Sequence, residues 1–76
     1  MMKLPRLSGR EVVKILAKAG FQPARQKGSH IIMVKFTDNG KKALVVPNHS
    51  ELDKGTLLEI IRQAGLTREE FFKLLK

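Results

Sequence analysis

Apolar residues recur at helical spacing near the start of the chain, between two signals that bound a helix. Ser8 and Glu11 form an S-x-x-E capping box, in which each side chain accepts a hydrogen bond from a first-turn backbone N–H. Leu7 and Val12 flank the cap with the spacing of a hydrophobic staple, and Gly20 is a typical C-terminal stop. The pattern predicts one amphipathic helix between the cap and this glycine.

The middle of the chain changes to patterns that are typical of β-strands. Gly28-Ser29 is a turn signal, and Asp38-Asn39-Gly40 predicts a hairpin because Asn-Gly tolerates positive φ. Pro23 restricts the first strand to an edge position, and Pro47 ends the last one. The predicted strands are Phe21–Lys27, His30–Phe36 and Lys42–Val46.

The C-terminal third predicts two helices. Asp53 can cap a helix that ends at Gly65, and Thr67 with Glu70 forms a second capping box. The element order is therefore α-β-β-β-α-α, which predicts an α+β fold with a three-stranded antiparallel sheet and helices on one face. This is the layout of a double-stranded-RNA-binding domain. With 76 residues, we expect a single domain over 1–76.

The middle predicted strand has large apolar residues on both faces. One face carries His30, Ile32, Val34 and Phe36, and the other carries Ile31, Met33 and Lys35. A sheet that helices cover on one side alternates apolar and polar residues. We therefore expect the uncovered face to be partly apolar, which often marks a docking surface. A bulge or a helix end that covers these residues is the alternative.

Charge adds a functional indication. Fifteen Lys and Arg residues against seven Asp and Glu residues give a formal net charge of +8, which attracts polyanions. This charge favours nucleic acid as a partner over a surface that is merely well solvated. An acidic protein partner fits the charge equally well, and the two partners could share one surface. The sequence has no cysteine, no signal-like apolar run and no membrane-spanning stretch, so we expect a cytoplasmic protein without disulfides or thiolate metal sites.

His30 is the first candidate for acid–base chemistry, because imidazole titrates near neutral pH. Gly28 and Ser29 precede it, so the backbone can approach a ligand closely there. Arg25 and Lys27 lie just upstream and could bind the phosphate that adjoins a scissile bond. By itself, a histidine at a strand start is more often a solvated or hydrogen-bonded bystander.

RNA supplies its own nucleophile, the 2′-hydroxyl, so its cleavage needs only proton transfers and stabilisation of the phosphate charge. We expect no metal and no cofactor, since the sequence offers no paired carboxylates at useful spacing. Lys35 is a further candidate for phosphate binding. His49 is interpreted as a loop or helix-entry residue, or as a second acid–base group if the two strand ends lie close.

The sequence resembles the HicA family of mRNA interferase toxins, also called YcfA-like proteins, over essentially its whole length. The matching segments are Leu7-Ser8-Gly9-Arg10-Glu11, Ala19-Gly20-Phe21, Arg25-Gln26-Lys27-Gly28-Ser29-His30, Val46-Pro47-Asn48-His49, Lys54-Gly55-Thr56-Leu57 and Ile60-Ile61-Arg62-Gln63-Ala64-Gly65-Leu66. Each segment is short, and their order and spacing together make the resemblance specific.

This resemblance implies a double-stranded-RNA-binding-like fold, cleavage of mRNA and a catalytic histidine in the Gly-Ser-His motif, which is His30 here. It also implies a HicB-type antitoxin that blocks the active surface, in a higher-order toxin–antitoxin complex. The expected function is a metal-independent endoribonuclease toxin. A non-catalytic RNA-binding module and a protein-interaction subunit remain the alternatives.

Overall fold

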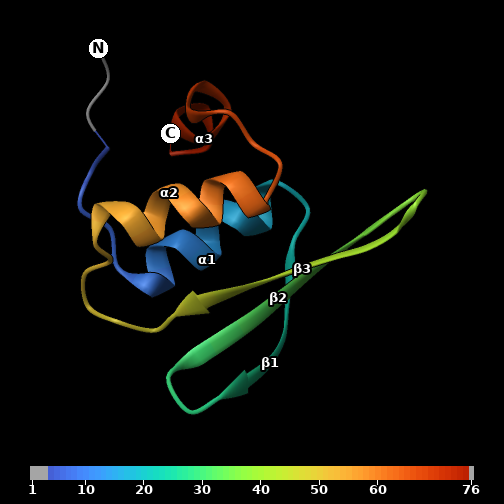
Figure 1. The fold of residues 1–76 in the computed structure, drawn as a ribbon, viewed down its shortest axis with the longest axis horizontal. Coiled ribbons are helices and arrows are strands. Elements are labelled where there is room, and N and C mark those ends of the chain that lie inside the picture. Colours follow the sequence, from blue (N-terminus) through green and yellow to red (C-terminus); the bar gives the residue numbers. More distant parts are fainter. Residues whose placement is uncertain (1–3, 76) are drawn as a thin grey trace.

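The structure is a computed structural model, and it describes residues 4–75. Three helices and a three-stranded sheet follow the predicted order (Figure 1). The elements are α1 Gly9–Lys18, β1 Gln22–Lys27, β2 His30–Thr37, β3 Gly40–Pro47, α2 Lys54–Gln63 and α3 Arg68–Leu74. The predicted fold class is confirmed, because the elements form the α-β-β-β-α-α arrangement of a double-stranded-RNA-binding domain.

The helices begin and end at the residues that the sequence marks. Both capping boxes form, with Ser8 Oγ accepting from the Glu11 N–H at 3.1 Å and Thr67 Oγ1 accepting from the Glu70 N–H at 3.1 Å. Asp53 caps α2 by accepting a 2.7 Å hydrogen bond from the backbone N–H of Thr56. The helix starts therefore coincide with the local capping signals of the sequence.

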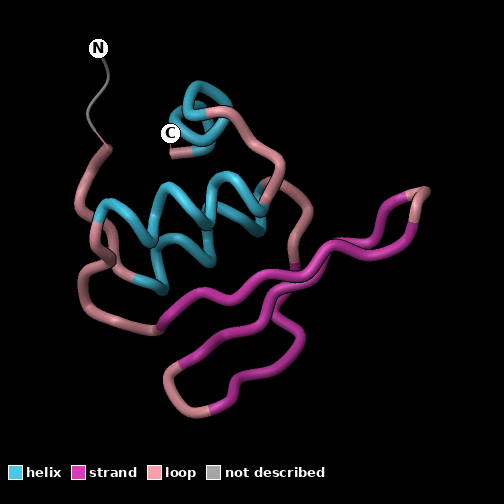
Figure 2. The backbone as a smooth tube through the Cα atoms, viewed as in Figure 1, coloured by secondary structure: helices cyan, strands magenta, loops and turns pink. Residues whose placement is uncertain are grey.

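The sheet has the order β1-β2-β3 and is antiparallel throughout (Figure 2). The predicted hairpin forms and Thr37 pairs with Gly40, but only the glycine of the Asn39-Gly40 pair has a positive φ, of 126°. The hairpin prediction is therefore confirmed, and the positive φ of the Asn-Gly pair lies at the glycine. Because the flexible glycine absorbs the unusual conformation as the first residue of β3, Asn39 does not have to.

Helices α1 and α2 lie side by side over one face of the sheet, and α3 lies on the far side of this helical layer (Figure 1). The core fills the space between them, and its largest fully buried side chains are Val12, Leu16, Phe21, Met33, Val46, Leu57 and Phe71. Each such side chain stabilises the fold by about 1.5–3 kcal/mol relative to an exposed position. All three helices, including the short α3, thus contribute to one core.

The opposite face of the sheet is not covered by helices, and we call it the open face. Because cross-strand partners share a face, the register assigns it Gln22, Arg25, Lys27, His30, Ile32, Val34, Phe36, Lys41, Ala43, Val45 and Pro47. Phe36 is 75% exposed and Val45 is 43% exposed. This confirms the expected partly apolar surface. The only register shift in the sheet lies in β1, between Pro23 and Arg25, so no bulge removes the β2 residues from this face.

Candidate functional site

His30 is the first residue of β2, and its side chain is exposed. The register places it directly between Lys27 of β1 and Pro47 of β3. Directly opposed residues of an antiparallel pair project from the same face, so His30 and Lys27 form one row of the open face. Among the described residues, nothing forms a hydrogen bond or an ion pair with the imidazole. The ring is therefore accessible from solvent.

Arg25 lies in the next row of the open face, where it pairs with Ile32. It alternates with Lys27 along β1, and both side chains are exposed. Neither forms an ion pair with any residue that the structure describes. Two cations and an imidazole thus occupy adjacent positions on one surface, an arrangement that can hold a phosphodiester beside an acid–base group.

The turn before His30 is held by backbone contacts. Gly28 has a φ of 60°, the left-handed region that favours glycine, and a Cβ atom there would meet nothing within 4 Å. The carbonyl oxygen of Ser29 accepts a 2.6 Å hydrogen bond from the backbone N–H of Asn48. The space around the glycine is open, and the approach of a ligand there stays a prediction. The hydrogen bond ties the turn to the residue that follows β3.

His49 lies in the loop between β3 and α2 and is exposed. Its carbonyl oxygen accepts a 2.9 Å hydrogen bond from the backbone N–H of Gly9. The bond between Asn48 and Ser29 brings this loop next to the turn that carries His30, so the two strand ends do lie close. The geometric condition for a second acid–base group is met, and the role of His49 stays a prediction.

Asp53, the cap of α2, lies close enough to His49 for their charges to interact. The pKa of its carboxyl lies below the usual 3.8 because Thr56 donates hydrogen bonds to it, and the charge of His49 adds a smaller lowering. This carboxylate is already committed to the helix cap.

Lys35 is not brought together with His30. It pairs with Lys42 on the face that the helices cover, at the end of the sheet that faces Gly20. Its Nζ lies 5.8 Å from the centroid of the Phe21 ring, a cation–π arrangement. The structure thus gives Lys35 a structural contact on the face opposite the histidine.

Sequence reasoning assigned no role to Gly9, the first residue of α1. A Cβ atom there would overlap the carbonyl oxygen of Pro47 and lie 3.0 Å from the Cα atom of Asn48. The N-terminus of α1 therefore packs backbone to backbone on the loop that supports His30. The signal in the sequence was a glycine at a helix start that neither caps nor ends the helix. Its role becomes visible only through the tertiary contact with Pro47 and Asn48.

Within residues 4–75 no group of three or more His, Cys, Asp and Glu side chains could hold a metal ion. No helix in the same range is both long and apolar enough to cross a membrane. The site as described consists of an imidazole, two cations and the backbone of a glycine-containing turn.

Comparison with known proteins places this site inside a family. The family model described as HicA toxin of bacterial toxin–antitoxin matches residues 9–66, which include α1, the whole sheet and α2. A search of curated proteins found no match. Since the matched range is more than half of the chain and contains His30, Arg25 and Lys27, the sequence resemblance is confirmed. The chain belongs to the HicA family of toxins from bacterial toxin–antitoxin systems.

Proposed function

We propose that this HicA-family toxin is an endoribonuclease that cleaves mRNA in the cytoplasm, with His30 as its acid–base catalyst. The observation that carries the proposal is the row of the open face in which the exposed imidazole stands opposite Lys27, one row from Arg25. Fold by itself does not give function, so the proposal rests on this site and on the family.

The chemistry follows from the substrate. The 2′-oxygen of a ribose attacks the adjacent phosphorus, the bond to the 5′-oxygen breaks, and a 2′,3′-cyclic phosphate and a 5′-hydroxyl result. One base takes the proton of the 2′-hydroxyl and one acid donates a proton to the leaving oxygen. His30 supplies one of these transfers, and His49, on the neighbouring loop, is the candidate for the other. The reaction consumes no cofactor and requires no metal.

Arg25 and Lys27 stabilise the charge that develops on the phosphate. Opposed residues of two strands have Cβ atoms about 4.5–5.5 Å apart, so the Lys27 ammonium can reach a phosphate that contacts His30. The Gly28-Ser29 turn leaves the backbone accessible beside them. Lys35 stays a predicted phosphate contact. Because it lies on the face that the helices cover, it would meet RNA only where the RNA strand passes around the edge of the sheet.

A HicB-type antitoxin is the proposed inhibitor. The net charge of +8 and the exposed Phe36 and Val45 offer charge and apolar area to an acidic protein. Such a partner covers His30 and cancels the field that attracts RNA. Inhibition by occlusion needs no conformational change in the toxin.

The test is replacement of His30 by Ala. We expect His30→Ala to keep the circular-dichroism spectrum, since the side chain is exposed, and to lose cleavage of RNA in EDTA by about 10²–10⁴-fold. Induction of His30→Ala should therefore no longer arrest growth. His49→Ala tests the second proton transfer in the same way, and it should also reduce cleavage if His49 supplies that transfer. Wild-type cleavage by His30→Ala would remove this residue from the mechanism.

One observation favours a second function, RNA binding without cleavage. No described residue orients the His30 ring, whereas catalytic imidazoles are usually held by a partner. Catalytic hydrogen bonds often tighten only when substrate binds, so the nuclease remains the better-supported reading. Purified protein that retards RNA on a gel in EDTA and leaves it intact would support the binding module instead.

A further inference from the structure

We propose that the outer edge of β3, together with the groove between β3 and α2, binds an extended acidic segment of the antitoxin as a fourth strand of the sheet. The inference takes the antitoxin from the family and does not depend on nuclease activity. It assigns a binding mode to a surface other than the histidine site.

The outer edge of β3 carries unused backbone hydrogen-bonding groups. Antiparallel pairs alternate between those that exchange both bonds and those whose N–H and C=O groups point outward. A two-residue turn closes on an exchanging pair, here Thr37 with Gly40, so the outward positions are Lys41, Ala43, Val45 and Pro47. No described residue bonds to the outward groups of Ala43 or Val45. The edge is a template for one more strand.

The other edge of the sheet is less suited to strand addition. β1 contains Pro23, which has no N–H, and its register shifts between Pro23 and Arg25. Proline and bulges are the features by which proteins protect sheet edges. Its exposed cations, Arg25 and Lys27, belong to the proposed RNA site. The two edges thus differ in function as well as in geometry.

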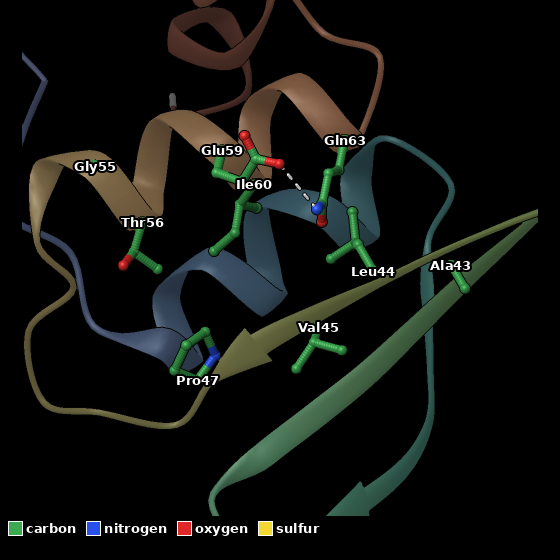
Figure 3. A pocket seen from close by; sticks show the side chains of 9 residues that line it. All are labelled: Ala43, Leu44, Val45, Pro47, Gly55, Thr56, Glu59, Ile60 and Gln63. Atoms are coloured by element: carbon green, nitrogen blue, oxygen red, sulfur yellow. Dashed lines mark hydrogen bonds between the residues drawn. The ribbon is translucent and has the colours of Figure 1, made fainter.

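A groove of about 610 Å³ runs along the β3 edge (Figure 3). Its walls are one face of α2 and the backbone and side chains of β3, and we call it the β3–α2 groove. It is lined by Ala43, Leu44, Val45, Pro47, Gly55, Thr56, Glu59, Ile60 and Gln63. A sheet edge flanked by a helix is a geometry in which an extended peptide gains backbone bonds from the strand and side-chain contacts from the helix.

Charge selects the occupant. Glu59 is the acidic residue among the lining side chains, and it already binds Arg62 and Gln63. Lys41 and Lys42 lie at the hairpin end of β3, and Lys54 begins α2 at the other end. A segment with small or apolar residues in its middle and acidic residues at its ends matches this arrangement. A second copy of the chain would bring another +8 to the same surface, which disfavours it.

The added strand would also act on the nuclease site. Pro47 pairs with His30, so a fourth strand would pass two strand spacings, about 10 Å, from β2. Side chains on its outward-facing positions would extend the open face next to Val45 and Pro47. Backbone hydrogen bonds to β3 would then position the rest of the antitoxin over His30, and contacts to the catalytic residues would not be needed.

Amide hydrogen exchange tests directly whether the antitoxin forms backbone hydrogen bonds with β3. The probe is the antitoxin that restores growth when co-expressed, in complex with ¹⁵N-labelled His30→Ala chain, which can be produced whether or not the wild type is toxic. In the free chain we expect the amides of Ala43 and Val45 to exchange rapidly, and those of Leu44 and Val46, which face β2, to exchange slowly. In the complex, Ala43 and Val45 should become as slow as their neighbours.

A matched pair of variants tests the groove. A Cβ atom on Gly55 would have only the Asp53 Oδ1, at 3.8 Å, within 4 Å, so the backbone there accepts a Cβ atom without a clash. Gly55→Trp should fill the groove and weaken antitoxin binding by about tenfold or more, while RNA cleavage in the His30-containing chain stays unchanged. Gly55→Ala should leave both properties unchanged. Circular dichroism confirms that both variants fold.

Several outcomes would overturn the proposal. Rapid exchange of Ala43 and Val45 in the saturated complex would show that the antitoxin does not add a strand at this edge. Full affinity in Gly55→Trp would exclude the groove. Protection of the same amides by RNA, or by raising the concentration of the free chain, would assign the edge to nucleic acid or to self-association. A chain that does not cleave RNA but shows the expected protection would overturn the nuclease proposal alone.

Discussion

Gly9 is the residue whose missing side chain matters most to the site. The first turn of α1 approaches Pro47 and Asn48 so closely that a Cβ atom would overlap a carbonyl oxygen. The adjoining backbone also forms the bonds from Gly9 to His49 and from Asn48 to Ser29. One glycine thus sets the distance between a helix start and the segments that carry both histidines.

We expect Gly9→Ala to destabilise the protein by about 1–3 kcal/mol, since backbone atoms must shift to admit the methyl group. Urea denaturation measures the change. Gly55→Ala is the control, because its methyl group would meet only the Asp53 Oδ1 at an ordinary contact distance and alanine favours helix by up to about 1 kcal/mol. Equal stability of Gly9→Ala and the wild type would show that the loop adjusts freely.

The sequence could predict His30, Arg25 and Lys27 as neighbours, because strand alternation and a two-residue turn determine which side chains share a row. It also placed Lys35 on the opposite face, although the residue type made it a phosphate candidate. It could not predict the role of Gly9 or the approach of His49, since both depend on contacts between residues far apart in the sequence: Gly9 with Pro47, and Asn48 with Ser29. Local patterns determine faces, and packing determines which loops meet.

At the scale of elements, α2 depends on a titratable cap. The pKa of the Asp53 carboxyl is lowered below 3.8, chiefly by hydrogen bonds from Thr56, so the folded state binds its proton more weakly than the unfolded chain does. The resulting stabilisation is present above the usual pKa and is lost as the pH falls through the lower folded value. The start of α2 also forms one wall of the β3–α2 groove.

We therefore expect Asp53→Asn to lower the melting temperature near neutral pH, because asparagine caps the helix without a charge. The difference from the wild type should shrink and disappear at pH values well below 3.8, where the aspartate is protonated in both states. Thermal melts across this range measure it. A difference that stays constant with pH would show that the charge of the cap contributes nothing.

At the scale of the whole molecule, charge is divided between two faces of the sheet. Arg25, Lys27 and Lys41 project from the open face, while Lys35 and Lys42 pair on the face that carries the helices. In the proposed function, the net charge of +8 would attract RNA to the molecule as a whole, and the open-face cations would decide where it binds. Salt dependence can separate these contributions.

We expect Lys27→Gln to reduce the slope of log affinity against log salt by about 0.7, the value for one phosphate contact to a single strand. Lys35→Gln is the matched comparison, and a smaller change is expected because its Nζ lies over Phe21 on the other face. Binding is measured with the His30→Ala chain so that the RNA stays intact. Identical slopes for both variants would mean that the open face does not determine where the RNA backbone binds.

The position of α3 has a practical consequence. This helix lies behind α1 and α2 as seen from the sheet, and its Lys73 is exposed. A fluorophore or a sensor-chip linker attached at this lysine would leave the histidine row and the β3 edge unobstructed at the same time. RNA and antitoxin could then be passed in turn over one immobilised sample, and their mutual exclusion read as displacement.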